Sequence, residues 1–94
     1  MDNLIMTKIN KALADETRIK ILKLLAQGQN CGCDLIGSLN ITQPTLSHHL
    51  KVLVQAGIIS GVKTQNKIHY TVHLNVIEEA HALLIGHLKE MPNC

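Results

Sequence analysis

The chain has 94 residues and a mass of 10.3 kDa, which is enough for one small domain and too little for two hydrophobic cores. Apolar residues make up 46% of it, yet Phe and Trp are absent and Tyr70 is the only aromatic residue, so the core must be aliphatic. This composition argues against binders of single-stranded nucleic acid, because those stack bases on aromatic rings. The net charge of +2 does not suggest a chromatin-like protein.

Neither a membrane segment nor a targeting segment is visible in the sequence. No apolar run approaches the roughly 18 residues of a membrane span, and the start, Met1-Asp2-Asn3, lacks the basic and apolar regions of a signal peptide. We therefore expect a cytoplasmic protein whose three cysteines are thiols rather than disulfides.

The charges are unevenly distributed along the chain. No acidic residue occurs between Leu35 and Ile77, whereas Lys51, Lys63 and Lys67 all fall in that stretch. The middle of the chain is thus suited to face a polyanion, although an ordinary solvated surface would give the same pattern.

Apolar residues at helical spacing, bounded by capping residues, predict four helices in the first part of the chain. Asp15 and Thr42 are the expected N-caps of the second and fourth helices, and Gly28 and Gly57 the residues that end them. The predicted helices are Asn3–Ala14, a helix from Asp15 to Gly28, Cys31–Leu39, and a helix from Thr42 to Ala56.

The pattern then changes to alternating, β-rich runs. A two-stranded hairpin with a basic tip is predicted, followed by a last helix capped by Asn75, with the ranges Ile58–Val62, Lys63–Lys67, Ile68–Val72 and Val76–Glu90. A short helix, a tight turn, a capped longer helix and a basic hairpin form a winged helix-turn-helix. We expect a single, mainly α domain over residues 1–94, with the β-hairpin as its wing.

The fourth predicted helix has two distinct faces. Leu46, His49, Leu50 and Leu53 share an apolar stripe, in which His49 is better explained as a hydrogen-bonded core histidine than as a DNA contact. The opposite face is polar and has no carboxylate to repel phosphate. Its N-terminal side chains would contact base edges, and the lysines would hold phosphates. The predicted DNA-contacting residues are Gln43, Thr45, Ser47, His48, Lys51, Lys63, Asn66 and Lys67.

Three segments, in this order, resemble the ArsR/SmtB family of metal-sensing repressors: Ala12-Leu13-Ala14-Asp15-Glu16-Thr17-Arg18-Ile19-Lys20-Ile21-Leu22, Cys31-Gly32-Cys33-Asp34-Leu35 and Gln43-Pro44-Thr45-Leu46-Ser47-His48-His49-Leu50-Lys51. The resemblance covers nearly the whole chain. It implies a winged-helix homodimer that binds a palindromic operator in double-stranded DNA and is released when an inducer binds.

The last helix has more apolar surface than one small core needs. Ile77, Ala80, Leu84 and Leu88 form one stripe, and Val76, Leu83 and His87 a second. The second stripe, like the apolar first helix, is expected to meet a partner. The family likewise dimerises through its terminal helices; the alternative is that both stripes wrap one core.

Cys31 and Cys33 are the candidate inducer ligands, at the start of the third predicted helix. Thiolates favour arsenite, antimonite, Cd(II), Pb(II), Cu(I) or Zn(II). Two residues apart on a regular helix, their side chains point about 200° apart. Ligand binding would therefore have to unwind or bend the first turn, and Gly32 between them would make that distortion easier.

A third thiolate for arsenic is less well defined. Some related arsenic sensors have a third cysteine where Ile36 stands, so Cys94 is the remaining candidate. A zinc site on the last helix is not expected, because His87 and Glu90 supply only half of the family's ligand pattern and Leu74 and Val76 cannot ligate.

Several alternatives remain open from the sequence alone. The same fold suits a thiol redox or persulfide sensor, although a disulfide between residues i and i+2 would be strained. It also suits a repressor that senses Cd, Pb or Zn, or a DNA binder without any ligand. We expect no enzyme and no cofactor for DNA binding, because Ser47, His48 and His49 have no acidic residue nearby in the sequence.

Overall fold

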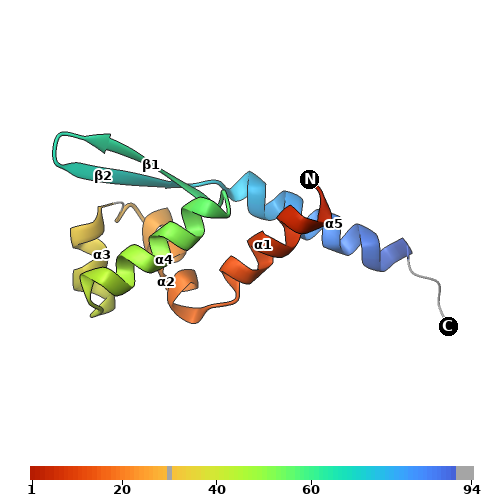
Figure 1. The fold of residues 1–94 in the computed structure, drawn as a ribbon, viewed down its shortest axis with the longest axis horizontal. Helices are drawn as coiled ribbons and strands as arrows, with labels where there is room; N and C mark the ends of the chain where they lie inside the picture. Colours follow the sequence, from red (N-terminus) through yellow and green to blue (C-terminus); the bar gives the residue numbers. More distant parts are fainter. Residues whose placement is uncertain (30, 91–94) are drawn as a thin grey trace.

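The computed structural model describes residues 1–29 and 31–90. In these residues the chain forms five helices and one antiparallel two-stranded hairpin, in the order predicted for a winged helix-turn-helix (Figure 1). The elements are α1 (Asn3–Leu13), α2 (Glu16–Ala26), α3 (Gly32–Leu39), α4 (Gln43–Gln55), β1 (Ile59–Thr64), β2 (Lys67–Val72) and α5 (Leu74–Glu90).

The helix boundaries follow from local side-chain chemistry. Asp15 Oδ1 accepts a hydrogen bond from the backbone N–H of Arg18 at 3.0 Å, and this bond lowers the pKa of the Asp15 carboxyl. Thr42 Oγ1 accepts one from the N–H of Thr45 at 3.4 Å. The glycines that follow α2 and α4 have φ of +98° and +77°, a conformation that L side chains rarely adopt. The predicted caps and stops of α2 and α4 are thus confirmed.

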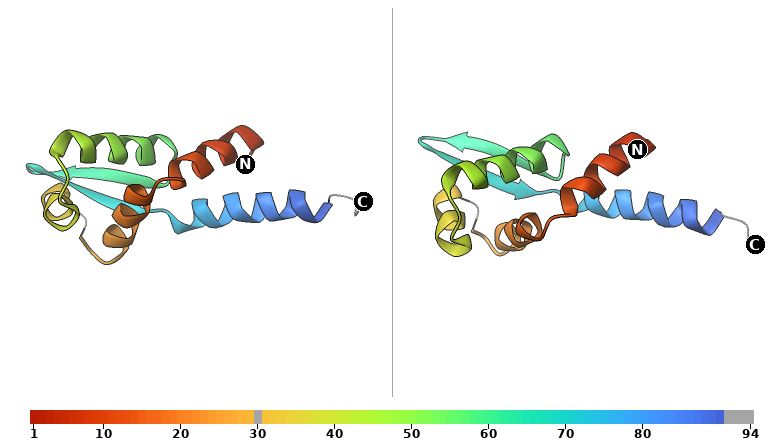
Figure 2. Two further views of the ribbon diagram at one scale, coloured as in Figure 1. Left: turned by 90° about the horizontal axis from the view of Figure 1, so that it is seen from below. Right: turned by 60° about the horizontal axis from the view of Figure 1, so that its bottom comes forward.

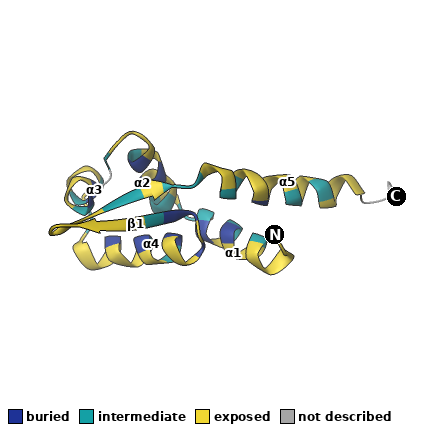
Figure 3. Cartoon of the chain, turned by 90° about the horizontal axis from the view of Figure 1, so that it is seen from above, coloured by how far each residue is buried: buried dark blue, intermediate teal, exposed yellow. Residues whose placement is uncertain are grey.

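The core is aliphatic, as the composition requires. It lies where α2, α3 and α4 pack together beneath the hairpin, with contributions from α1 and α5, and the buried sides of the helices face it (Figure 3). The predicted inward stripe of α4 is buried at Leu46, Leu50 and Leu53. The whole cluster comprises Ile9, Ala12, Ile21, Leu22, Leu25, Leu35, Leu46, Leu50, Leu53, Ala56, Ile58, Ile59 and Ala80.

The terminal helices extend away from this core. α1 packs against α5, and the two give the molecule an elongated shape of 54 × 24 × 21 Å (Figure 2). Within α5, all of which the structure describes, Ala80 is the only buried residue. Large apolar side chains on both helices stay in solvent, including Leu4 at 79% exposed and Leu88 at 60%. None of the helices in the described residues has the length and apolar content needed to cross a bilayer.

The hairpin is longer and its turn tighter than the sequence predicted. β1 continues to Thr64 and β2 begins at Lys67, so Lys63 and Lys67 lie in strands rather than in a loop. Gln65 and Asn66 alone make the turn, and Gln65 has φ of +54°. A two-residue turn lets the polar residues on both sides pair across the strands.

The predicted cap of the last helix is wrong. α5 begins at Leu74, so Asn75 lies inside its first turn rather than before it. The N–H of His73 donates to the carbonyl of Ile58 at 2.8 Å, and the carbonyl of His73 accepts from the N–H of Val76 at 3.1 Å. The end of the hairpin therefore sets the start of α5, and this is a contact between distant parts of the chain.

Thr42 should stabilise the start of α4 through its cap. We expect Thr42→Ala to lower the free energy of unfolding by about 1 kcal/mol, because it leaves the N–H of Thr45 without its partner. Thr42→Asn should retain most of the stability. Gln43→Ala is the matched control, since it shortens an exposed side chain in the same turn and leaves the contacts of Thr42 with Thr45 in place. Urea denaturation measures all three, and equal stability of Thr42→Ala and wild type would contradict the assignment.

Candidate functional site

The polar face of α4 is exposed over its whole length. Gln43, Thr45, Ser47, His48 and Lys51 all lie in solvent, as predicted for a face that contacts DNA. The exposed side chains of Lys63, Asn66 and Lys67 stand on the hairpin. All eight predicted DNA-contacting residues are therefore accessible.

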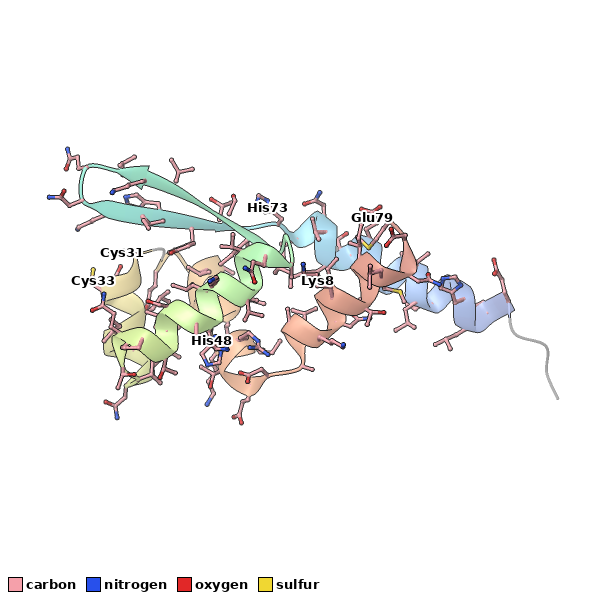
Figure 4. The ribbon with its side chains drawn as sticks, viewed as in Figure 1. Lys8, Cys31, Cys33, His48, His73 and Glu79 are labelled. Atoms are coloured by element: carbon pink, nitrogen blue, oxygen red, sulfur yellow. The ribbon has the colours of Figure 1, made fainter. Side chains whose placement is uncertain are left out.

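His49, next to this face, is held inside the fold. Its side chain is half-buried, and its Nδ1 lies 3.4 Å from Arg18 Nη1. Arg18 Nε in turn donates to the carbonyl of Ala12 at 2.8 Å. His49 thus has the intramolecular partner that was predicted, and the pair joins α4 to the junction of α1 and α2. His48, whose ring centre lies 5.7 Å from that of His49, is exposed (Figure 4).

The two candidate ligand thiols lie side by side at the start of α3. Cys31 Sγ and Cys33 Sγ are 2.7 Å apart, and both are free cysteines (Figure 4). Cys31 is only 9% exposed, whereas Cys33 is open to solvent. One thiophilic atom can reach both sulfurs from the solvent side.

This arrangement overturns the prediction that the thiols point apart. α3 begins at Gly32, and Cys31 is its N-cap, with extended backbone angles of φ −112° and ψ 141°. The helical rotation of 100° per residue therefore does not apply between Cys31 and Cys33. Joining the two sulfurs requires no unwinding of α3, and the role suggested for Gly32 in easing such unwinding loses its basis.

A contact with the wing holds Cys31 in this conformation. The backbone of Cys31 pairs antiparallel with that of His69, in β2. β2 thus has β1 on one edge and Cys31 on the other. Cys31 is therefore held against the wing by its backbone, whereas Cys33 belongs to α3, the helix that precedes the turn to α4.

The two thiols differ in acidity. The Cys33 thiol, followed by the backbone amides of Cys33 and Asp34, lowers the pKa of Cys31. The same contact with Cys31, followed by burial, raises the pKa of Cys33. Backbone amides at a helix N-terminus favour a thiolate. These shifts favour the thiolate form at Cys31 over that at Cys33.

The thiols open into a cleft of about 500 Å³ between α3, α4 and the hairpin. Ile68 and Tyr70 form its wall on the wing side, together with Cys31 and Cys33 on the α3 side. Gly61 in β1 is paired with Tyr70. A Cβ at Gly61 would come within 3.1 Å of the Tyr70 ring, so a larger residue there would displace the ring.

Half of the predicted DNA contacts stand around the same cleft. Gln43 and Ser47 line it from α4, and Asn66 and Lys67 from the hairpin. Lys67 is close enough for its charge to lower the pKa of both thiols. Thr45, His48, Lys51 and Lys63 are not part of the lining. The structure thus places the candidate ligand site and part of the candidate DNA surface in one cleft.

Ile68 and Tyr70, which line the cleft, were not predicted from the sequence. Their signal was present, because alternation along β2 puts residues 68, 70 and 72 on one face of the strand. What the sequence could not show is that this face meets the start of α3.

Two other metal-ligand candidates have different outcomes. Cys94 lies outside the described residues. His87 Nε2 is 3.0 Å from Asn3 Oδ1 and so links α5 to α1. Within residues 1–29 and 31–90, no three side chains of His, Cys, Asp or Glu converge in a way that would hold a metal ion.

Comparisons with known proteins agree with the geometry. The sequence pattern of a family described as "Bacterial regulatory protein, arsR family" matches residues 15–60. The "Arsenical resistance operon repressor" of Staphylococcus aureus is 38% identical over 74 residues, which are 79% of this chain and 71% of the relative. "Transcriptional repressor SdpR" of Bacillus subtilis is 37% identical over 75 residues, 80% of this chain and 83% of the relative.

The fold also has close counterparts among solved structures. An "ArsR-like Transcriptional Regulator" from Rhodococcus sp. RHA1 superimposes with a TM-score of 0.83 at 24% identity, over 93% of this chain and 82% of that one. The structural similarity thus extends beyond residues 15–60, which match the family pattern, to the hairpin and the terminal helices. On its motifs, its fold and these relatives, the chain belongs to the ArsR/SmtB family of transcriptional repressors.

Proposed function

We propose that this repressor responds to a metalloid. In the proposal, the ligand-free dimer binds a palindromic operator, and arsenite or antimonite bound by Cys31 and Cys33 releases it. The observation that carries the proposal is the pair of thiols, 2.7 Å apart, in a cleft lined by both α4 and the wing. The name of the S. aureus relative, an arsenical resistance operon repressor, supports the same ligand class.

The chemistry of the site suits trivalent arsenic. Thiolates are soft ligands, and each thiol that condenses with arsenous acid forms one As–S bond and releases one water. Cys31, with its lowered pKa, attacks first, and Cys33 completes the second bond. The third position on arsenic keeps a hydroxyl or takes a third thiolate. We propose Cys94 for that third thiolate.

The DNA surface consists of α4 and the wing. The N-terminal half of α4 enters the major groove, where Gln43, Thr45, Ser47 and His48 reach base edges. The other four residues, Lys51, Lys63, Asn66 and Lys67, contact the backbone and fix the register. All eight side chains are exposed in the structure, which is the condition that this assignment requires.

We further propose that the chain acts as a homodimer through α1 and α5. Leu84, Ile85 and Leu88 on α5, and Leu4 and Ile5 on α1, leave an apolar surface that a second copy would cover. A two-fold axis there places two α4 helices about one turn of DNA apart, roughly 34 Å. As a repressor that binds operator DNA, the protein would act in the cytoplasm.

The short sulfur–sulfur contact also favours a second candidate, a thiol redox sensor. In it, peroxide takes two electrons and the two thiol protons from Cys31 and Cys33; the thiols join in a disulfide, and the peroxide leaves as two waters. The strain expected for residues i and i+2 is reduced because Cys31 lies outside the helix. Metal(loid) and peroxide responses separate the two candidates.

Base-reading and phosphate-binding residues should respond differently to substitution. We expect Ser47→Ala and His48→Ala each to weaken the free energy of binding to the operator by about 1–3 kcal/mol, and to weaken binding to random duplex by less. Lys63→Ala should weaken binding to both duplexes and reduce the salt slope by about 0.9 for the lost phosphate contact. Fluorescence anisotropy over a salt series measures both effects. Equal losses on both duplexes for every variant would remove the base-reading assignment.

The inducer can be identified by titrating candidate ligands into the complex of the protein with the DNA upstream of its own gene. We expect arsenite to release the protein, and Cys33→Ala to abolish that response. Gly37→Ala, exposed on the same helix and outside the cleft, is the matched control and should respond as wild type, because the added Cβ meets no other atom within 4 Å.

The pH dependence of release provides an independent check. When protonated thiols condense with arsenous acid, water is released and no proton is. The release of the protein from DNA by arsenite should therefore not change between about pH 6 and pH 8. Cd(II) must displace the proton of Cys33, whose pKa is raised, so any Cd(II) response should strengthen as the pH rises. Release by peroxide or Cd(II) without release by arsenite would contradict the proposed inducer.

A further inference from the structure

The cleft that holds the two thiols lies on the surface assigned to DNA. Gln43 and Ser47 stand on one side of it, on α4, and Asn66 and Lys67 on the other side, at the tip of the wing. If α4 lies in the major groove and the wing on the adjacent backbone, the strand that connects the two contacts passes across this cleft. The thiols then lie beneath the DNA backbone rather than at a remote site.

Lys67 is the residue that would contact both the inducer on the thiols and a DNA phosphate. Its charge acts on both sulfurs, and it is also one of the predicted phosphate contacts. A metalloid bonded to Cys31 and Cys33 adds an atom and its remaining oxygen or sulfur ligand to the space between α3 and Lys67. A phosphate group that approaches the same lysine would meet that added group.

The alternative route from ligand to DNA is a change in the shape of α3, and the structure does not require it. The sulfurs already face each other at 2.7 Å, and Cys31 is held outside α3 by its pairing with His69. Both sulfurs can therefore bind one arsenic atom without displacing the helix that leads into α4.

We infer that inducer and operator compete for this cleft, so that release occurs by mutual exclusion of ligand and DNA and not by a conformational change of α3. The inference rests on the proposed function, because it assumes that arsenite binds the two thiols. It adds the mode of regulation: a complex that contains both arsenite and operator at one subunit does not form.

The dependence of operator affinity on arsenite concentration tests this inference. With exclusion, the apparent Kd for the operator rises by a factor that approaches tenfold per excluded site for each tenfold increase in arsenite well above the arsenite Kd, and it does not level off. A conformational coupling instead levels off at a fixed ratio, typically about 5–150-fold. A plateau, or arsenic retained in the DNA-bound fraction, overturns the inference.

Protection of the thiols by DNA gives a second, independent readout. Saturating operator should slow the alkylation of Cys33 by iodoacetamide about tenfold or more, since Cys33 is exposed in the free protein. The matched control is a Gly37→Cys variant, which adds a thiol on the same helix outside the cleft, and the alkylation of that added thiol should keep its rate. An unchanged rate at Cys33 overturns the inference.

The failure of the proposed function has a different signature. If arsenite does not slow the alkylation of Cys33 by iodoacetamide in the DNA-free protein, arsenite is not the ligand of the thiols, and the proposal and the inference both fall. If arsenite blocks the thiols but operator affinity reaches a plateau, the proposed function stands and exclusion alone is refuted.

Discussion

The antiparallel pairing of Cys31 with His69 determines the geometry of the whole site. Because the backbone of Cys31 lies along β2, the residue takes an extended conformation and α3 starts one residue later. That single change turns two thiols that would have diverged into a contact pair. It also brings the pair against the wing, and thereby onto the surface proposed to face DNA. The contact, the cleft and the proposed competition all depend on this one pairing.

Much of the fold could be predicted because its determinants are local. Asp15 and Thr42 bond to amides three residues ahead, and the aliphatic stripe of α4 repeats at helical spacing, so a short window of sequence contains the signal. The prediction failed where a contact between distant parts of the chain sets the boundary of a helix. Asn75 looks like a cap, but His73 is fixed by Ile58 at the start of the hairpin.

The same distinction applies to the site. The exposed face of α4 and the thiol pair were predicted from residue types and spacing. The orientation of the two sulfurs was not, since it depends on a partner strand far along the chain. Ile68 and Tyr70 line the cleft only because the hairpin folds onto α3, and this tertiary contact leaves no signal in the periodicity of the sequence. Sequence pattern thus identified the reactive groups, and the fold determined how they act together.

The central claim is that the thiols bind one arsenic atom while α3 and its link to the wing stay intact. Backbone amide NMR on the arsenite-saturated protein, with arsenic–sulfur coordination measured by X-ray absorption, tests it most directly. We predict arsenic bonded to sulfur, helical chemical shifts retained from residue 34 to residue 39, and preserved contacts between the backbones of Cys31 and His69. Loss of the helical shifts in the first turn of α3, or of the pairing with β2, would contradict it.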